Sequence, residues 1–266
     1  MPEVQRGASI AEKFDLSGRT AIVTGVGPGI GAHVAAALAA AGAKVVCSAR
    51  STAVITETAA AIRASGGEAL AVTADILDAD ARVSLVNQAR AAFGPIHILF
   101  NNATAGAIAP EAGIWGNTPE VWDRALGANI TAIFHLAELV HPDMEEHEQG
   151  SIITVGSSGG FSVIGNSIAY SVAKAGTAML TRYLAKAMAP ATRVNMISVG
   201  AITPDGGESE SMKTYSQLDL TRRNAIQRLG QADEVVGAAL LLASSASSYT
   251  TGSTIFVDGG RIGTMG

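Results

Sequence analysis

The sequence predicts an α/β fold of the doubly wound type, with a seven-stranded parallel sheet covered by helices on both faces. Short β-branched runs alternate with long alanine-rich segments from near the start of the chain to its end, and this alternation is typical of β-α-β units around a parallel sheet. Runs such as IHILF and SIITV are apolar on both faces, as strands covered by helices on each side must be.

The order of the elements follows from these runs. Strands are expected at residues 20–24, 44–48, 69–73, 97–100, 151–155, 193–198 and 253–257. Helices are expected at residues 31–41, 53–64, 79–93, 119–146, 169–188 and 232–242. Thr118 and Pro119 mark the start of the longest helix, as its cap and its first-turn residue, and Gly150 is expected to close it.

The whole chain, residues 1–266, is expected to form one domain, because no linker, repeat or composition break divides it. Residues 202–227 depart from the alternating pattern, since they are polar and contain Gly206-Gly207. Open parallel sheets bind ligands at the carboxyl ends of their strands, where this segment would lie. We therefore expect it to be a mobile flap over a substrate site.

Composition and charge exclude several classes of protein. Hydrophobic residues make up 48% of the chain and charged residues 15%, which indicates a globular protein rather than a disordered one. The net charge of -5 provides no basic surface for a nucleic acid. No apolar stretch approaches the ~20 residues needed to cross a bilayer, and residues 1–18 do not have the pattern of a signal peptide. We expect neither a nucleic acid nor a membrane as partner.

Cysteine and histidine usage adds two expectations. Cys47 is the only cysteine, so no internal disulfide can form, and a reducing, cytoplasmic location is expected. The five histidines show no metal-ligand spacing with cysteine or carboxylate partners, so no metal site is expected.

A glycine-rich turn lies between the first expected strand and the first expected helix. Missing Cβ atoms permit a tight turn and the close approach of a pyrophosphate, and the N-terminus of the following helix attracts its charge. The position after a strand and before a helix favours a Rossmann-type dinucleotide site over a plain turn. The candidate binding residues are Gly25, Gly27, Gly29, Ile30 and Gly31.

Tyr170 and Lys174 lie four residues apart in an expected helix, which places them on the same face. A free phenol has a pKa of about 10, and a neighbouring ammonium would lower that pKa and make the tyrosine an acid or base near neutral pH. An isolated pair with this spacing is more often a surface contact on a solvated helix. The surrounding motifs decide between the two interpretations.

With these motifs in place, the chain resembles the compact branch of the short-chain dehydrogenase/reductase family from Leu16 to Gly260. The glycine turn fits the family pattern T-G-x-x-x-G-x-G, and Ser157 stands thirteen residues before Tyr170, where the catalytic serine of the family is found. The other matching positions are Asp75-Ile76, Asn101-Asn102-Ala103, Asn129, Arg228-Leu229-Gly230 and Val257-Asp258-Gly259-Gly260.

The resemblance implies a role for each of these residues. Tyr170 would exchange a proton with the substrate oxygen, which Ser157 would hold. Lys174 would lower the pKa of Tyr170 and bond the nicotinamide ribose, and Asn129 would anchor a water that links the lysine to solvent. The cofactor would carry the hydride. Further implied cofactor contacts are Asp75, Ile76, Asn102, Ala103, Gly200, Ile202 and Thr203.

Two departures from the family pattern bear on the pocket. Thr104 replaces the glycine of N-N-A-G and adds a Cβ and a hydroxyl beside the path of the cofactor. After the sixth strand, Val199 stands where proline is usual, and Thr203 comes one position early. Ile202 is still expected to meet the carboxamide of the cofactor, whereas the direction of the Thr203 hydroxyl stays open.

The end of the second expected strand bears on the choice of dinucleotide. An acidic side chain there would bind the ribose 2′-hydroxyl of NAD, but Ala49-Arg50 offers a guanidinium suited to a 2′-phosphate. NADP is therefore the preferred cofactor, and NAD with a solvent-facing Arg50 is the alternative.

Apolar side chains are expected around the substrate, namely Ile108, Trp115, Phe161, Ile164 and Met212. Three residues between tyrosine and lysine favour carbonyl chemistry, because enoyl reductases of the family place six there. The chain resembles both bacterial hydroxysteroid dehydrogenases and 3-oxoacyl carrier-protein reductases, so a hydrophobic ketone or secondary alcohol is expected as substrate, and steroid, acyl and small-ketone substrates stay open. The resemblance also implies a homotetramer. The alternative function is a non-catalytic dinucleotide sensor on the same fold.

Overall fold

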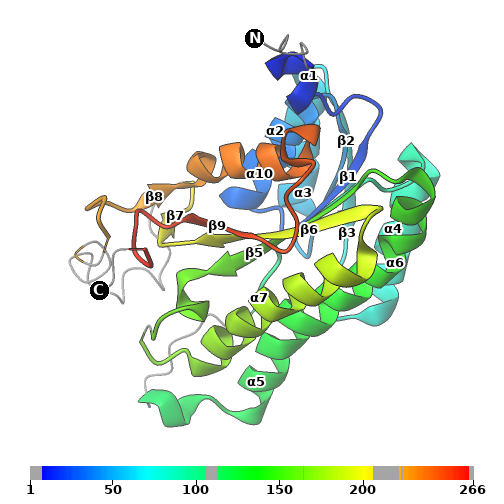
Figure 1. Cartoon of the computed structure of the whole chain (residues 1–266). Coiled ribbons are helices and arrows are strands. Elements are labelled where there is room, and N and C mark those ends of the chain that lie inside the picture. The colour runs from blue at the N-terminus through cyan, green and yellow to red at the C-terminus, as the bar shows by residue number, and fades with distance from the viewer. Residues whose placement is uncertain (1–7, 106–112, 164, 206–221, 223, 264–266) are drawn as a thin grey trace, which may run out of the picture.

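Seven parallel strands form one sheet at the centre of the structure (Figure 1), a computed structural model that describes residues 8–105, 113–163, 165–205, 222 and 224–263. Their order across the sheet is β3-β2-β1-β4-β5-β6-β9. The expected strands are confirmed, with ends that differ by one or two residues. The strands are β1 (Thr20–Thr24), β2 (Lys44–Ala49), β3 (Glu68–Thr73), β4 (Ile98–Asn101), β5 (Gly150–Ser157), β6 (Thr192–Val199) and β9 (Thr254–Val257).

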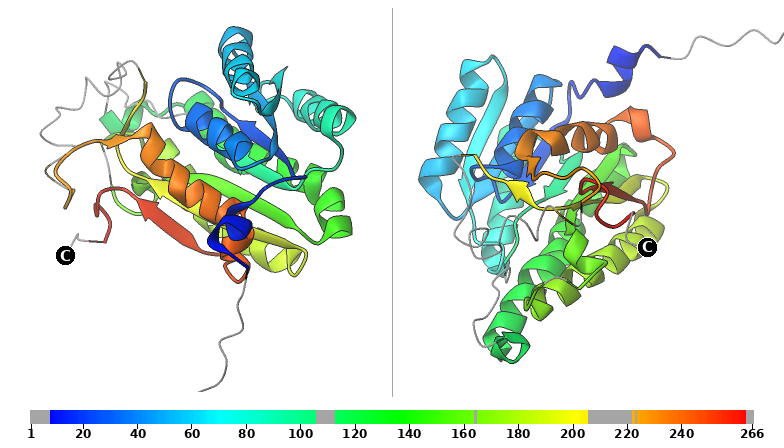
Figure 2. Two further views of the ribbon diagram at one scale, coloured as in Figure 1. Left: turned by 90° about the horizontal axis from the view of Figure 1, so that it is seen from above. Right: turned by 90° about the vertical axis from the view of Figure 1, so that its left-hand side faces the viewer.

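Helices cover both faces of the sheet, as expected (Figure 2). Helices α2, α3 and α10 pack on one face through one hydrophobic cluster, and α4, α6 and α7 pack on the other face through a second cluster. The helices are α1 (Ile10–Phe14), α2 (Ile30–Ala40), α3 (Thr52–Ala64), α4 (Ala79–Phe93), α5 (Pro119–Leu126), α6 (Ala132–His147), α7 (Ile168–Met188) and α10 (Val236–Ala243).

The strand order reverses between β1 and β4, and this reversal positions the site. Strand β1 pairs with β2 on one side and with β4 on the other, and all five of its residues are buried. The connections that leave the carboxyl ends of β1 and β4 run in opposite directions across the sheet, which opens a crevice between them. The glycine turn follows β1 and the segment from Asn102 follows β4, so both border this crevice.

The helix expected at residues 119–146 is not one regular α-helix. It is divided into α5 and α6 by a π-helical turn, η2 (Gly127–Thr131). The Nδ2 atom of Asn129 donates to the carbonyl of Ala125 at 2.8 Å, and that carbonyl is the one that residue 129 would bond through its backbone in an α-helix. The expected end at Gly150 is also wrong, because α6 ends at His147 and Gly150 begins β5.

Several short elements had no counterpart in the expected pattern. Helix α1 begins with a reciprocal capping box between Ser9 and Glu12. Strands β7 (Ile202–Thr203) and β8 (Gly230–Gln231) form a separate two-stranded sheet that brings together the first residues of the expected flap and residues just after it. Across the described parts of the chain, no helix has both the length and the hydropathy that a membrane span requires.

Candidate active site

The glycine turn joins β1 to α2 at the carboxyl edge of the sheet. A Cβ on Gly25 would lie 2.6 Å from the backbone of Ala103, and a Cβ on Gly31 would lie 2.5 Å from the carbonyl oxygen of Gly25. Side-chain carbons do not approach other atoms so closely, so both positions require glycine. The turn is thereby held against the end of β4, with the first residues of α2 facing the space in front of it.

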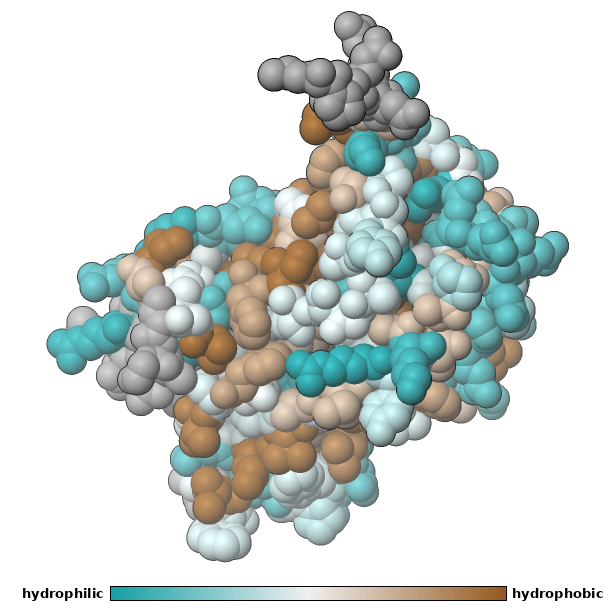
Figure 3. All heavy atoms as spheres, viewed as in Figure 1, coloured by the Kyte–Doolittle hydropathy of each residue, from teal (hydrophilic) through white to brown (hydrophobic). Residues whose placement is uncertain are grey.

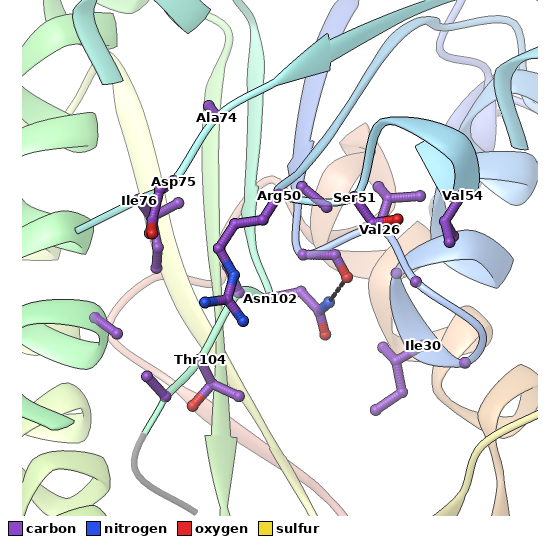
Figure 4. Close-up of a pocket in the computed structure, with 18 of the residues that line it drawn as sticks. Val26, Ile30, Arg50, Ser51, Val54, Ala74, Asp75, Ile76, Asn102 and Thr104 are labelled. Atoms are coloured by element: carbon purple, nitrogen blue, oxygen red, sulfur yellow. Dashed lines mark hydrogen bonds between the residues drawn. The ribbon is translucent and has the colours of Figure 1, made fainter. Parts of the chain in front are cut away.

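A cavity of about 510 Å³ lies in front of this turn (Figure 4). Its volume is within the range of small-molecule and cofactor sites, ~300–1,000 Å³. It extends over the carboxyl ends of β1 to β4, where the strand order reverses. The expected binding residues that line it are Gly25, Gly27, Gly29, Ile30, Gly31, Arg50, Asp75, Ile76, Asn102, Ala103 and Ile202.

Arg50 and Ser51 line the cavity where β2 passes into α3. The Arg50 side chain points into the cavity in Figure 4, and it makes no hydrogen bond or ion pair with the residues that the structure describes. Ser51 is the N-cap of α3, but its hydroxyl bonds no backbone N–H of that helix. A guanidinium, a hydroxyl and a helix N-terminus are all suited to an anion. Sequence reasoning missed Ser51, although its position before a helix was a usable signal.

The loop after β3 forms another wall of the cavity. Asp75 accepts a hydrogen bond from the backbone N–H of Leu77 at 3.0 Å, which turns the chain. Arg82 of α4 is only 6% exposed, and it donates to the carbonyl of Ile76 and, at 2.9 Å, to Nδ1 of His135. A buried cation is costly unless it is hydrogen-bonded, so these bonds fix the backbone at Ile76. The contact with His135 spans 53 residues of sequence, which is why sequence reasoning missed Arg82.

Side chains of Asn102 and Thr24 tie the end of β4 to the glycine turn. Asn102 donates from Nδ2 to the carbonyl of Gly25 at 2.8 Å, as Figure 4 shows. The hydroxyl of Thr24 accepts hydrogen bonds from the backbone N–H groups of Asn102 and Ala103 at 3.1 and 3.2 Å. The Asn102 amide therefore shapes the turn itself, and Thr24 is a further supporting residue that sequence reasoning did not single out.

Helix α7 places Tyr170 and Lys174 one turn apart, with the lysine Nζ atom 5.6 Å from the centre of the tyrosine ring. Lys174 is 3% exposed and donates to the carbonyl of Val155 at 2.7 Å. The hydroxyl of Tyr170 is hydrogen-bonded to Ser157, the last residue of β5. A solvated surface pair would not have these contacts, so the structure brings together three of the four expected catalytic residues.

Burial governs the pKa values of this pair. It lowers the pKa of Lys174 from 10.5 to about 7. It also raises the pKa of Tyr170, and the hydrogen bond with Ser157 offsets only part of that rise. The sequence predicts that the lysine lowers the pKa of the phenol. Burial therefore opposes the lowering expected from the lysine, because it removes the solvation of a charged phenolate. The effect of Lys174 itself stays a prediction.

Asn129 lies in the π-helical turn and is fully buried. Its Nδ2 donates to the carbonyls of Ala125 and Ala105, at 2.8 and 3.1 Å. Its Oδ1 accepts from the hydroxyl of Thr104 at 2.8 Å, and its backbone carbonyl accepts from Thr177 at 2.9 Å. Both amide hydrogens are committed, so a water could be held at this residue only through an oxygen atom.

The segment after β6 reaches the cavity through Ile202. Gly200 packs against the end of β9 instead, because a Cβ on it would lie 2.8 Å from Cα of Asp258. Thr203 belongs to the small sheet of β7 and β8. The expected contacts of Gly200 and Thr203 with the cofactor therefore stay predictions.

Much of the expected substrate side lies outside the described residues, including residues 206–221 and 223 of the flap and the side chains of Ile108, Ile164 and Met212. Trp115 is 89% exposed in the short helix η1 (Gly113–Gly116). Phe161 packs edge-on against Phe256, with ring centres 5.0 Å apart. The apolar character of the substrate stays a prediction.

Neither metal nor thiol chemistry is indicated by the residues that the structure describes. Among them, no group of three or more His, Cys, Asp or Glu side chains could hold a metal ion. Cys47 is completely buried in β2, and burial raises the pKa of its thiol to about 12.

Comparison with known proteins places this site in a family. A family model described as enoyl-(acyl carrier protein) reductase matches residues 25–261. The 7alpha-hydroxysteroid dehydrogenase of Escherichia coli K12 is 33% identical over 253 residues, which cover 95% of this chain and 97% of that protein. A 3-oxoacyl-(acyl-carrier-protein) reductase of Synechocystis is 34% identical over 250 residues, covering 93% of this chain and 98% of that protein.

Two solved structures are similar over nearly the whole chain. A 7α-hydroxysteroid dehydrogenase complexed with NADH and 7-oxo glycochenodeoxycholic acid has a TM-score of 0.87 and 32% identity, covering 95% of this chain and 98% of that chain. A gluconate 5-dehydrogenase from Burkholderia cenocepacia with NADP and tartrate has a TM-score of 0.86 and 30% identity, covering 96% and 99%. The chain belongs to the short-chain dehydrogenase/reductase family and is an oxidoreductase that acts on CH–OH groups with NAD(P).

Proposed function

We propose that this chain interconverts a secondary alcohol and a ketone, with Tyr170 as the group that gives and takes the proton. One observation carries the proposal: Lys174 is buried one turn from Tyr170, and Ser157 is hydrogen-bonded to the phenol. A lysine is almost never buried without a specific reason. Proton transfer at the carboxyl end of β5 supplies that reason.

Each residue of the site has a task in this reaction. In ketone reduction, the Tyr170 hydroxyl gives its proton to the carbonyl oxygen, which Ser157 holds by a hydrogen bond. In alcohol oxidation the proton returns to Tyr170. With a pKa of about 7, Lys174 can gain or release a proton near neutral pH and so restore the phenol. Asn129 binds the water that passes this proton to solvent. A bound nicotinamide dinucleotide supplies or accepts the hydride.

The cavity fits such a dinucleotide. Gly25 and Gly31 let the turn pack closely against the segment after β4, and the backbone of Gly27 has open space in front of it. The N-terminus of α2 faces the same cavity, as a pyrophosphate requires. The preferred cofactor is NADP, since Arg50 and Ser51 would bind the 2′-phosphate where NAD would need a carboxylate. The relatives themselves differ, because one structure contains NADH and another contains NADP.

The proposed substrate is a hydrophobic ketone or secondary alcohol, of the hydroxysteroid or 3-oxoacyl type. Phe161 and Val163 follow Ser157 closely in sequence and are 38% and 88% exposed, so they could contact an apolar substrate. Carbonyl rather than enoyl reduction is favoured by the spacing of Tyr170 and Lys174, although the matching family model is described as an enoyl reductase.

We also propose a homotetramer. Hydrophobic side chains gather over α5 and α7 in Figure 3. Val172, Met179 and Tyr183 of α7 are 46%, 50% and 70% exposed, and Phe134 of α6 is 52% exposed. An apolar area of this kind on a folded domain is typical of an interface between subunits. The cytoplasmic location and the single domain over residues 1–266 stay predictions.

A screen for turnover tests the proposed function. The purified chain is mixed with NADPH or NADH and a 7-oxo bile acid, a 3-oxoacyl thioester or 5-ketogluconate, and nicotinamide absorbance is followed. We expect oxidation of the reduced dinucleotide with at least one hydrophobic ketone, and faster reaction with NADPH. Turnover of 5-ketogluconate alone would contradict the apolar substrate. Tight dinucleotide binding without turnover of any compound would instead support a non-catalytic sensor.

A further inference from the structure

Thr104 lies in the segment that follows β4, where the family pattern has glycine, and its hydroxyl has a defined partner. Its Oγ1 lies 2.8 Å from Oδ1 of Asn129. Thr104 itself lines the cavity and is labelled in Figure 4, whereas Asn129 is fully buried behind it. The side chain of Thr104 therefore joins the wall of the cavity to the π-helical turn.

The hydrogen-bond pattern fixes the direction of this contact. Nδ2 of Asn129 faces two carbonyl oxygens, those of Ala105 and Ala125. Only an NH2 group can donate to both, so the orientation of the amide is set and its oxygen must face Thr104. An amide oxygen cannot donate, so the threonine hydroxyl is the donor. A glycine at position 104 could not make this bond.

Asn129 is held from its other side as well. Thr177 lies on α7 three residues after Lys174, and its hydroxyl donates to the backbone carbonyl of Asn129 at 2.9 Å. Two threonine hydroxyls thus bond the two oxygen atoms of one buried residue. The single hydroxyl hydrogen of Thr177 is shared between this carbonyl and that of Ala173 in its own helix. For Thr104, the bond to Asn129 is the one hydrogen bond that its hydroxyl makes to the described residues.

We propose that Thr104 is a positioning residue that holds Asn129 in the orientation the reaction requires. The inference rests on the proposed function, in which Asn129 binds the water that relays the proton from Lys174. Without the Thr104 hydroxyl, the buried amide oxygen loses its partner, and the amide can rotate away from Ala105 and Ala125. The segment after β4 would then lose its hydrogen bonds to the π-helical turn.

Three variants of this position separate the hydroxyl from the shape of the side chain. Thr104→Val keeps the shape and removes the donor, Thr104→Ser keeps the donor, and Thr104→Gly introduces the residue of the family pattern. We expect kcat to fall about tenfold in the valine and glycine variants, the size expected from one buried hydrogen bond. The serine variant should stay within about twofold of the wild type, and KM for NADPH should change less than about threefold in all three variants.

A matched control and a double-mutant cycle complete the kinetic test. Among the described residues, the hydroxyl of Thr58 in α3 bonds only its own helix, through the carbonyl of Val54, so Thr58→Val should leave kcat unchanged. If Thr104 acts through Asn129, then Thr104→Val should cause no further loss of kcat in an Asn129→Ala background. Additive losses, equal losses in the serine and valine variants, or an unchanged kcat in Thr104→Val would each overturn the proposal.

A second measurement does not depend on turnover. Hydrogen–deuterium exchange followed by mass spectrometry reports the opening of the backbone across residues 124–134. Thr104→Val should speed exchange there by about tenfold, and Thr104→Ser should not. If the wild type turns over no compound in the screen, the proposed function fails, but these exchange rates still decide whether Thr104 holds the turn. Unchanged exchange in Thr104→Val would overturn the inference about Thr104.

Discussion

Replacing Lys174 with methionine tests the burial of the lysine, on which the proton transfer depends. Methionine has a similar length and no charge, so the variant removes the titrating group with little change in packing. In the native protein the pKa of Lys174 is lowered to about 7, whereas its ordinary value is 10.5. Between these two pH values the unfolded chain binds a proton that the native protein lacks, so raising the pH stabilises the wild type.

The size of this effect follows from the two pKa values. Above the native pKa, the free energy of unfolding rises by about 1.4 kcal/mol for each pH unit until the unfolded lysine also loses its proton. Integrated from pH 7 to pH 9, the difference in bound protons between the unfolded and native states adds about 2 kcal/mol to the free energy of unfolding. Below pH 7 both states are protonated and this dependence disappears. The wild type should therefore gain about 2 kcal/mol relative to Lys174→Met over that pH range.

Urea unfolding followed by circular dichroism at pH 7, 8 and 9 measures this difference directly. All samples need the same protein concentration and no added dinucleotide, because assembly and binding also change stability. Lys186→Met is the matched control, since Lys186 lies on the same helix with an exposed side chain. If the difference in the free energy of unfolding between the wild type and Lys174→Met does not change from pH 7 to pH 9, the reasoning is refuted.

Two further substitutions test the cofactor side of the cavity. Arg50→Ala should raise KM for NADPH by about 10- to 100-fold and KM for NADH by much less, because a charge-assisted contact to the 2′-phosphate is lost. Initial-rate assays with both dinucleotides measure this, and equal changes in the two KM values would argue against NADP. Arg82→Met should leave the carbonyl of Ile76 and Nδ1 of His135 without a donor. We expect this variant to bind the dinucleotide about tenfold more weakly and to be less stable by about 1–3 kcal/mol. Titration calorimetry measures the binding and urea unfolding measures the stability. Unchanged values for both would show that Arg82 does not fix the loop after β3.

The sheet was predictable because each strand carries its own signal. A parallel strand covered on both faces is a nearly continuous apolar run, without the alternation of a half-exposed strand, and β1, β4 and β5 are buried at every position. The π-helical turn was not predictable, because it depends on the side chain of Asn129 taking the carbonyl that an α-helix would use. No pattern of residue types distinguishes an asparagine whose side chain takes a backbone carbonyl from an ordinary asparagine in a helix.

The site was predictable where it depends on short spacings. Tyr170 and Lys174 lie on one helical face because they are four residues apart, and the glycine turn must follow a strand. Contacts between distant segments were missed, such as the bond from Thr104 to Asn129 across 25 residues. The rise that burial causes in the pKa of Tyr170 was also missed, because spacing does not reveal burial.

The central claim is that the hydroxyl of Tyr170 moves the proton of the reaction. Comparing Tyr170→Phe with the wild type, at saturating NADPH and with the best ketone of the screen, tests it most directly. Tyr249→Phe, at a tyrosine whose side chain is fully exposed, is the control. We expect Tyr170→Phe to lose at least about 100-fold in kcat while it binds NADPH as tightly as the wild type. A kcat close to that of the wild type would contradict the account.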